Sequence, residues 1–351
     1  MKISEKIFAI GLMSGTSLDG LDLCYAVFHK DTHWNYEILH SQTLAYPENW
    51  ENKLRQSTSL KAEELYALNS EYGFYLGEKV AEFISQNKIT TLDVIASHGH
   101  TIFHQPHRKF TIQIGDGRAI KILNNYPVVY DFRNQDVLMG GNGAPLVPIG
   151  DHLLFSEYDA CSNLGGFSNI SLVHQQKRIA FDICPVNIVL NQSAMALGQK
   201  YDSSGKMARS GTLNHEILEK LNQLDFYQNK FPKSLGIEWV QKFVVPLLKN
   251  ISPQDTLATM TAHCAMQISA VLEQFSIKKA LFTGGGAYND FLIEEIKKKT
   301  QTEIIIPEKN LIEFKEALIF AFMGVLRLRN EINILASATG STRDHCSGLL
   351  V

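Results

Sequence analysis

Two segments rich in glycine and hydroxyl residues, one in each half of the chain, constrain the fold more than any other feature. Residues 8–17 (FAIGLMSGTS) and residues 161–169 (CSNLGGFSN) both start with a strand-like run and continue into small, turn-forming residues. A strand-like run that ends in such a turn and leads into a second strand-like run is typical of a β-hairpin. Two such hairpins predict a duplicated α/β domain, although the identity between them is too low to establish a repeat by itself.

The rest of the chain alternates short β-branched runs with longer segments of helical spacing. We expect strands at residues 7–12, 21–28, 94–97, 128–130, 161–164, 170–173, 179–182 and 280–283, and helices at 62–86, 119–124, 256–275, 291–299 and 317–326. A length of 351 residues is typical of two domains. The glycine-rich segment 139–145 indicates a loop near a domain boundary. We therefore place the first lobe at residues 1–130 plus about 330–351, and the second at 131–329.

Composition and charge argue against several classes of function. The net charge is −3, from 33 basic and 36 acidic residues, so we expect no nucleic-acid partner. The five cysteines are widely spaced and form no CxxC pair, which favours free thiols in a reducing compartment. No stretch approaches the roughly 20 apolar residues that span a bilayer, and the apolar run 7–10 is too brief to favour a signal peptide. We therefore expect no membrane partner.

The first motif, residues 13–22 (MSGTSLDGLD), combines phosphate-binding groups with carboxylates. Backbone N–H groups of a tight glycine turn and neighbouring hydroxyls can bind phosphate oxygens. The groups available for this are Ser14, Gly15, Thr16, Ser17 and Gly20. Asp19 and Asp22 can hold Mg²⁺, which prefers few carboxylates together with phosphates and waters. An ordinary hairpin turn uses the same residue types, so the motif alone leaves both interpretations open.

A second motif, residues 163–170 (NLGGFSNI), repeats this chemistry in the other half of the chain. It predicts a second phosphate clamp made by Gly165, Gly166 and Asn169. A plain β-turn is the alternative interpretation.

A third motif, residues 283–289 (TGGGAYN), lies between an expected strand and an expected helix. Gly284, Gly285 and Gly286 allow a close approach to a ligand, and Asn289 stands where the helix begins. A loop that needs positive φ angles is the alternative. The chain lacks the P-loop and protein-kinase signatures, which argues against both of those classes.

Asp182 is a candidate general base. It ends the expected strand 179–182, and carboxylates at strand ends face the ligand site of an α/β domain. Asp131 and Glu316 are further candidates, while Arg133 can bind a carboxylate or phosphate through two N–H groups. The alternatives are a cap for Asp182, a helix-dipole role for Glu316 and a surface ion pair for Arg133.

Histidines 98, 100, 104 and 107 raise the question of a zinc site. No cysteine lies near them, and their spacing falls on an expected strand and loop. We favour a His/Thr pair, His98 with Thr101, that donates to a ligand hydroxyl.

Six ordered segments resemble motifs of the anhydro-N-acetylmuramic acid kinase family. They are residues 13–22, 97–101 (SHGHT, family SHGQT), 131–133 with 140–148 (DFR and GGNGAPLVP, family GGQGAPLVP), 163–170 (family NIGGIANI), 283–289 (family GGGAxN) and 316–321 (EALIFA, family EALAFA). The resemblance covers nearly the whole chain, and only the end from residue 339 onward matches loosely.

This resemblance implies a two-lobed α/β fold of the ribonuclease H-like, actin/hexokinase/Hsp70 type, with ATP in a central cleft. It implies a kinase that opens the 1,6-anhydro ring of anhydro-N-acetylmuramic acid with water and phosphorylates O6, during peptidoglycan recycling in the bacterial cytoplasm. In that role Asp182 would activate the water and Mg²⁺ would neutralise charge. His98, Thr101, Arg133 and Glu316 would contact the sugar. A homodimer is implied by analogy.

One segment departs from the family pattern, because FDTGPGN reads here as FDICPVN at residues 181–187. Cys184 and Val186 add side chains where the family backbone can approach a sugar or phosphate. We therefore keep two alternatives: a kinase of another anhydrosugar, and a non-catalytic nucleotide- or sugar-binding protein. A ligand-binding screen separates these hypotheses, since ATP binding without any response to sugar would indicate the last.

Overall fold

The structure, a computed structural model, describes residues 6–15 and 18–351. The chain forms two compact units: unit 1 is Met1–Leu154 with Phe314–Val351, and unit 2 is Phe155–Glu313. We predicted domain boundaries near residues 130 and 330, whereas the two units meet along the chain at residues 154–155 and 313–314. The glycine-rich segment 139–145 belongs to unit 1, where the Asp136 carboxylate accepts a hydrogen bond from Gly143 N–H.

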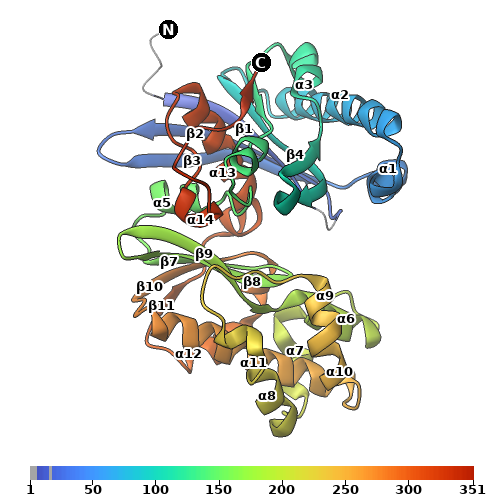
Figure 1. Cartoon of the computed structure of the whole chain (residues 1–351), viewed down its shortest axis with the longest axis vertical. Coiled ribbons are helices and arrows are strands. Elements are labelled where there is room, and N and C mark those ends of the chain that lie inside the picture. The colour runs from blue at the N-terminus through green and yellow to red at the C-terminus, as the bar shows by residue number, and fades with distance from the viewer. Residues whose placement is uncertain (1–5, 16–17) are drawn as a thin grey trace. The chain divides into compact units, whose positions relative to one another are not determined.

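Unit 1 is built on a mixed sheet with the strand order β12-β6-β4-β1-β2-β3, and β5 pairs with β4 (Figure 1). The strands are β1 (Lys6–Ser14), β2 (Leu21–Lys30), β3 (Trp34–Leu44), β4 (Val94–Gln105), β5 (Phe110–Ile114), β6 (Val128–Tyr130) and β12 (Leu349–Leu350). The helices are α1 (Glu48–Gln56), α2 (Ala62–Gln86), α3 (Gly117–Asn124), α4 (Asn134–Leu138), α5 (Pro148–Leu153), α14 (Ala336–Thr339) and most of α13 (Lys309–Leu328).

Unit 2 carries a second mixed sheet with the order β11-β10-β7-β8-β9. Its strands are β7 (Ala160–Leu164), β8 (Phe167–His174), β9 (Lys177–Pro185), β10 (Lys279–Thr283) and β11 (Glu303–Ile305). Its helices are α6 (Asn187–Ala196), α7 (Lys206–Ser210), α8 (His215–Asn222), α9 (Ile237–Trp239), α10 (Val245–Leu248), α11 (Pro253–Gln274) and α12 (Asp290–Lys297).

The two sheets share one topology. In unit 1, β1, β2 and β3 form an antiparallel meander, β4 lies parallel to β1, and β6 lies parallel to β4. In unit 2, β7, β8 and β9 form the meander, β10 lies parallel to β7, and β11 lies parallel to β10. The expectation of a duplicated α/β fold is confirmed, and this arrangement is the ribonuclease H-like one.

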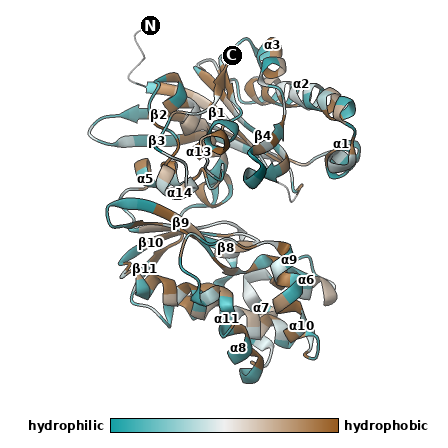
Figure 2. Cartoon of the chain, in the orientation of Figure 1, coloured by the Kyte–Doolittle hydropathy of each residue, from teal (hydrophilic) through white to brown (hydrophobic). Residues whose placement is uncertain are grey.

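Residues 317–326 of helix α13 are buried against one face of the unit 1 sheet, as expected. A Cβ atom on Gly11 of β1 would overlap the carbonyl oxygen of Ala317, so the close approach of helix and strand requires glycine there. Phe322 of α13 packs against Phe28 of β2 with ring centroids 5.3 Å apart. In Figure 2 α13 is hydrophobic, whereas the turn between β2 and β3 is hydrophilic.

The other face of the unit 1 sheet is covered by α1 and α2. Ile10 and Leu12 of β1, which alternate with Gly11, pack in one cluster with Trp50 of α1 and Tyr72 of α2. Helix α3 lies beside α2 (Figure 1). The alternation along β1 therefore sends its large side chains to one face and leaves the other face open to α13.

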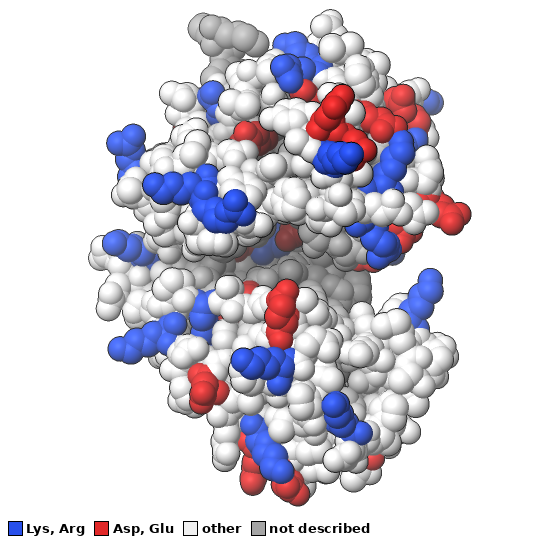
Figure 3. Space-filling model, turned by 45° about the vertical axis from the view of Figure 1, so that its right-hand side comes forward, with Lys and Arg blue, Asp and Glu red and all other residues white. Residues whose placement is uncertain are grey.

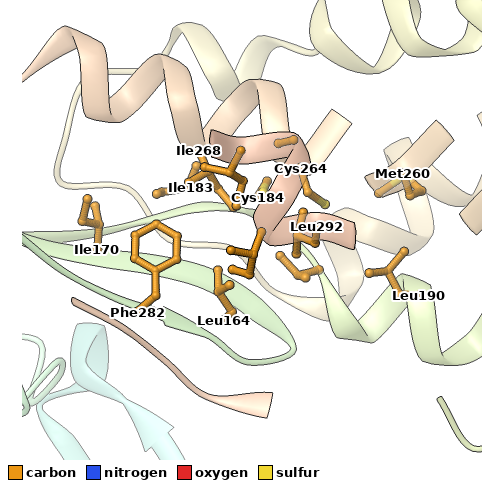
Figure 4. Packing of buried hydrophobic residues seen from close by; sticks show 14 of the residues in the cluster. Leu164, Ile170, Ile183, Cys184, Leu190, Met260, Cys264, Ile268, Phe282 and Leu292 are labelled. Carbon is orange, nitrogen blue, oxygen red and sulfur yellow. The ribbon is translucent and has the colours of Figure 1, made fainter. Parts of the chain in front are cut away.

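Helix α11 is the central helix of unit 2. It begins at a Ser252 cap, whose hydroxyl oxygen accepts the N–H of Asp255 at 3.0 Å. Ile268 of α11 packs with Leu164 of β7, Ile170 of β8 and Phe282 of β10 in one buried cluster (Figure 4). This cluster fixes the strand ends that carry the glycine-rich turns of unit 2.

Of the strands that are longer than expected, β4 and β9 matter most for the site. Strand β4 continues through the SHGHT segment to Gln105, and β9 continues three residues beyond Asp182 to Pro185. The expected ends at Ser97 and Asp182 were therefore wrong. The cause is pairing with distant strands, since β5 pairs with residues 100–105 and β8 pairs with residues 184–185.

Charged side chains are distributed over the surface. On the face in Figure 3, basic and acidic residues are interspersed. Several ion pairs join neighbours on one helix, as in Arg55–Glu51 and Lys220–Glu216, and such exposed pairs add little stability. Among the residues that the structure describes, no helix is both long enough and apolar enough to cross a membrane.

Candidate functional site

The first motif, in unit 1, begins with Ser14, whose hydroxyl group already has hydrogen-bond partners within the unit. Ser14 ends β1, is buried, and lies 2.8 Å from His100 Nδ1. Tyr46 donates its hydroxyl to Ser14 Oγ at 2.7 Å, and Tyr46 and Tyr72 share a hydrogen bond of 2.6 Å. Because Ser14 accepts from Tyr46, its own proton goes to His100 Nδ1, which requires the tautomer with hydrogen on Nε2. Ser14 thus anchors the motif inside unit 1 instead of presenting a hydroxyl to a phosphate.

His100 stands where the family has glutamine, and its Nδ1 takes part in a hydrogen bond with Ser14 inside unit 1. Burial lowers the pKa of His100 to about 4, so the ring is neutral near pH 7. A neutral ring can accept the hydrogen bond from Ser14, as a glutamine side chain also can. The departure from SHGQT therefore keeps an acceptor at this position.

The remainder of the first motif carries the two carboxylates. Asp19 is exposed, and Asp22 of β2 accepts a hydrogen bond from Thr43 at 2.6 Å. Gly15 accepts the N–H of Leu18 at 3.2 Å, and Gly20 is buried before β2. Thr16 and Ser17, predicted to bind phosphate, lie outside the described residues.

His98 and Arg133 form one buried assembly. Arg133 Nε donates to His98 Nε2 at 2.9 Å, so His98 is neutral and donates its Nδ1 hydrogen to Gly99 O, also at 2.9 Å. Burial and the neighbouring guanidinium both hold the pKa of His98 well below its usual value. Both ring nitrogens are therefore used within unit 1, and His98 orients Arg133 rather than offering a free donor to a ligand.

Arg133 is held by two hydrogen bonds, to His98 and to Gly143, yet keeps donors available. Its Nη1 donates to Gly143 O at 2.6 Å, in the glycine-rich segment. Burial lowers the pKa of Arg133 to about 10, while the carboxylates of Glu316 and Asp136 act in the opposite direction. It therefore stays charged near pH 7. Of the described residues, none accepts from Nη2, which can bind a ligand oxygen.

The other predicted residues of unit 1 have looser roles. Glu316 on α13 is exposed, and Thr101 on β4 accepts a hydrogen bond from Gln113 at 3.3 Å. Asp131 has φ 55° and accepts from Asn134 at 2.6 Å, which is turn geometry. Among the described residues, no three His, Cys, Asp or Glu side chains group as metal ligands, so the four histidines do not gather.

Asp136 is the residue of unit 1 that the sequence analysis missed. It is fully buried, and its two oxygens accept from Gly143 N–H and Thr339 Oγ1, both at 2.7 Å. It thereby shapes the glycine-rich segment that positions Arg133. The only signal in the sequence is an aspartate shortly before a run of glycines.

In unit 2 the second motif supports the start of helix α6. The turn at Gly165 and Gly166 joins β7 to β8, and Gly166 O accepts the N–H groups of Val186 and Ile188 at 2.8 and 3.1 Å. Asn187 donates its side chain to Leu164 O at 3.0 Å. The first donors of α6 are therefore satisfied by this turn, while Asn169 on β8 is exposed.

The third motif follows β10 directly. Gly284 has φ 81°, and a Cβ atom there would overlap Asn163 Oδ1 of the second motif. Asn289 caps α12, its side-chain oxygen accepting the N–H of Leu292 at 3.0 Å. The motif thus closes onto the second motif and ends in a helix cap.

A cavity of about 680 Å³ opens within unit 2 beside these motifs. Leu190, Ile306, Pro307 and Ile312 provide apolar walls. Polar groups come from α6, from the segments at 201–204 and 285–290, and from Lys309. Its volume lies within the range of small-molecule and cofactor sites. Gly285 and Asn289 line it, whereas Gly284 and Gly286 shape its wall from behind.

Asp182 lies on β9 and is half-buried. Leu235 N–H donates to Asp182 Oδ2 at 2.7 Å, and Asp182 N–H donates to Lys233 O at 3.0 Å. Burial raises the pKa of Asp182, and the hydrogen bond from Leu235 opposes that rise. A carboxylate with a raised pKa and one oxygen without a partner among the described residues is suited to accept a proton.

The departure at residues 181–187 has a structural explanation. Cys184 and Val186 are fully buried in the core of unit 2 and do not project into the cavity. Figure 4 shows Cys184 and Cys264 among the packed side chains of Ile183, Ile268 and Leu292. Cys264 also donates to Pro185 O at 3.2 Å. The extra side chains therefore fill the core behind Asp182.

Two units with ribonuclease H-like sheets, one of them with a cavity beside its glycine-rich turns, are the architecture of the actin/hexokinase/Hsp70 type. The sequence model of the anhydro-N-acetylmuramic acid kinase family matches residues 7–351. The chain therefore belongs to that family.

Individual relatives agree with this assignment. The anhydro-N-acetylmuramic acid kinase of Francisella tularensis subsp. novicida is 33% identical over 370 aligned positions, covering 97% of each chain. That of Bacillus cereus is 32% identical, covering 95% of this chain and 96% of its own. Among solved structures, component A of (R)-2-hydroxyglutaryl-CoA dehydratase from Acidaminococcus fermentans aligns over 91% of this chain and 97% of its own, at 13% identity and a TM-score of 0.46.

Proposed function

We propose that the protein phosphorylates O6 of 1,6-anhydro-N-acetylmuramic acid with ATP while water opens the anhydro ring. Asp182 takes a proton from water, and the water oxygen forms a bond to carbon 1. The bond from carbon 1 to O6 breaks, and O6 takes the γ-phosphoryl group as ADP departs. The products are the sugar 6-phosphate and ADP, with the water proton left on Asp182. The observation that carries the proposal is the half-buried Asp182, whose Oδ2 alone is hydrogen-bonded among the described residues.

The nucleotide half of the reaction is assigned to unit 2. The cavity takes the adenosine of ATP between its apolar walls, and Tyr288 and Asn289 stand at its border. Gly165 and Gly166 form the turn from which backbone groups can approach phosphates, because Gly166 is exposed and carries no side chain, and the exposed Asn169 on β8 adds an amide beside it.

The sugar half is assigned to unit 1. Arg133, oriented by His98 and Gly143, offers its remaining N–H groups to a carboxylate or phosphate oxygen. Thr101 and Glu316 supply a hydroxyl and a carboxylate for sugar hydroxyls. Holding the anhydrosugar in a reactive orientation is a large part of the expected acceleration.

Magnesium fits the carboxylates of the first motif. Asp19 is exposed, and Asp22 is fixed by Thr43, so both are oxygen donors of the kind that Mg²⁺ prefers. When bound with ATP, the ion would neutralise phosphate charge. The hydrogen bond from Thr43 fixes the orientation of the Asp22 carboxylate, which suits it to binding the ion.

We also propose a cellular setting. We place the protein in the bacterial cytoplasm, where ATP is available and where the five free cysteines stay reduced. Peptidoglycan recycling is the process that consumes an anhydromuramic acid there. A homodimer remains a prediction.

The test is ADP release from MgATP with purified 1,6-anhydro-N-acetylmuramic acid, with the product mass checked for the gain of both phosphate and water. We expect sugar-dependent release. N-acetylmuramic acid, which lacks the anhydro ring, serves as the control substrate. Release only with another anhydrosugar would transfer the assignment to that sugar. ATP binding without response to any sugar would instead indicate a binding protein.

We expect kcat/KM to fall on the acid side of its pH profile. The fall should be centred at a pH above 3.8, the usual pKa of an aspartate. The base must be ionised to accept a proton, and burial raises the pKa of Asp182, so activity falls as the pH drops through that raised value. Steady-state rates from about pH 4 to pH 8 measure this limb. An acid limb at or below 3.8 would contradict the assignment of Asp182.

Gly284→Ala is expected to weaken ATP binding by at least about tenfold, because an added methyl overlaps Asn163 and displaces the wall of the cavity. Gly198→Ala is the matched control, since Gly198 has the same φ of 81° but a Cβ there meets nothing within 4 Å. Titration calorimetry with an ATP analogue compares the two. Equal losses would mean that backbone strain, and not the contact with Asn163, determines binding.

A further inference from the structure

Asp182 is bound at two points by a segment far from it in the sequence. Strand β9 is the last strand of the unit 2 sheet, with β8 on one side. On its other side, Lys233 O accepts Asp182 N–H at 3.0 Å, and Leu235 N–H donates to Asp182 Oδ2 at 2.7 Å. The same short segment therefore holds both the backbone and the carboxylate of this residue.

This segment is itself anchored. Tyr227 donates its hydroxyl to His263 Nε2 on α11 at 2.7 Å, and His263 Nδ1 donates to Asn222 Oδ1 at 2.7 Å. Lys233 Nζ donates to Phe226 O at 3.1 Å, which closes the segment on itself. We call residues 226–235 the base-holding loop. Its start is fixed to α11, and its end is presented to Asp182.

We infer that the base-holding loop is the positioning element of the reaction, in which the Leu235 N–H fixes Asp182 Oδ2 and leaves Oδ1 to take the proton from water. This inference rests on the proposed function. Of the described residues, only Leu235 forms a hydrogen bond with the carboxylate, so removing that N–H frees the side chain to rotate. A rotated carboxylate presents its oxygens to water in several directions, and few of them are productive.

Several ionisable groups lie around the base-holding loop. Among the described residues, however, the direct polar contact of the Asp182 carboxylate is the Leu235 N–H. Burial raises the pKa of Cys184 on β9 and of Tyr227 on the loop, and lowers the pKa of His263 on α11 to about 3, so these groups are neutral near pH 7. Cys264 on α11 donates to Pro185 O. The loop carries two cationic side chains: Lys230, which is exposed, and Lys233, whose ammonium donates to Phe226 O.

The test compares Leu235→Pro, which removes the N–H, with Leu235→Ala, which keeps it. We expect Leu235→Pro to lower the plateau kcat on the order of tenfold. We also expect it to move the acid limb of kcat/KM upward by about one pH unit, since a lost hydrogen bond to the ionised form raises a carboxyl pKa. Leu235→Ala should keep the wild-type limb. A residue with only a structural role would lower the plateau without moving the limb.

Lys233→Met and Tyr227→Phe are the test variants to use if Leu235→Pro does not fold. Both keep the Leu235 N–H but loosen the base-holding loop, and each should move the acid limb in the same direction by a smaller amount. A limb that stays at the wild-type pH in every folded variant overturns the inference. If wild type is active and Asp182→Asn is not, that result leaves the proposed function intact, whereas an inactive wild type refutes the proposed function first.

Discussion

Asp182→Asn is expected to lower kcat for sugar-dependent ADP release by about a thousandfold, because the amide cannot accept the proton from water. The amide oxygen can still accept the Leu235 N–H, so the side chain keeps its position. ATP affinity should remain unchanged, since Asp182 does not line the cavity. Single-turnover kinetics and calorimetry with an ATP analogue measure the two quantities separately.

Asp225→Asn is the matched control for this variant. Asp225 belongs to the same unit, is exposed, and undergoes the same change of charge. It should retain full activity. Asp182→Asn that keeps more than about a tenth of the wild-type rate would remove Asp182 from the role of base.

The direction in which Asp182→Asn changes the stability of the folded state can be predicted. A carboxyl whose pKa is raised on folding destabilises the folded state above that pKa, and the penalty disappears as the pH falls through it. At pH 7 the neutral amide is therefore expected to leave the melting temperature unchanged or higher. A lower melting temperature would mean that loss of activity reflects misfolding.

Asp136→Ala is expected to destabilise unit 1 by roughly 3 kcal/mol, because the buried N–H of Gly143 loses its acceptor and the hydroxyl of Thr339 keeps only longer contacts to Ser341 Oγ, at 3.2 Å, and Leu335 O, at 3.4 Å. For a unit of this size, that corresponds to a fall of roughly 6–12 °C in the unfolding transition. Scanning calorimetry of the full chain measures the shift. The affinity for sugar should fall as well, since Gly143 O holds Arg133.

Asp136→Asn separates the loss of an acceptor from the loss of a side chain. The amide oxygen can replace one of the two acceptors, but the amide nitrogen then faces the other donor, so an intermediate shift is expected. An unchanged transition in Asp136→Ala would show that water satisfies both donors and that the carboxylate does not organise the glycine-rich segment.

Much of the site could be located from the sequence because its signals are local. A positive φ at Gly284 and a cap at Asn289 depend on a few neighbouring residues, so glycine and asparagine mark them. The same is true of the apolar run 317–326, which is buried in α13. The duplicated hairpins belong here too, since both were expected from residue types alone and both are present.

The roles within the site were harder to predict, because the sequence does not show which distant group a side chain meets. Ser14 and His98 have the residue types of ligand-binding groups. The fold uses their polar atoms internally, Ser14 with His100 and Tyr46, and His98 with Arg133. For the same reason the only signal for Asp136 was an aspartate shortly before a run of glycines, since its partner Thr339 lies 203 residues further along the chain.

The family, the duplicated α/β architecture and the positions of the glycine-rich turns could be predicted from the amino-acid sequence, because they depend on local conformational preference and on ordered motifs. The roles of those residues were set by the three-dimensional packing. It placed Cys184 and Val186 in the core, extended β4 and β9 by pairing, and brought Leu235 to Asp182. Hydrogen bonding and burial act over a few ångströms in space, so they can join residues that the sequence keeps far apart.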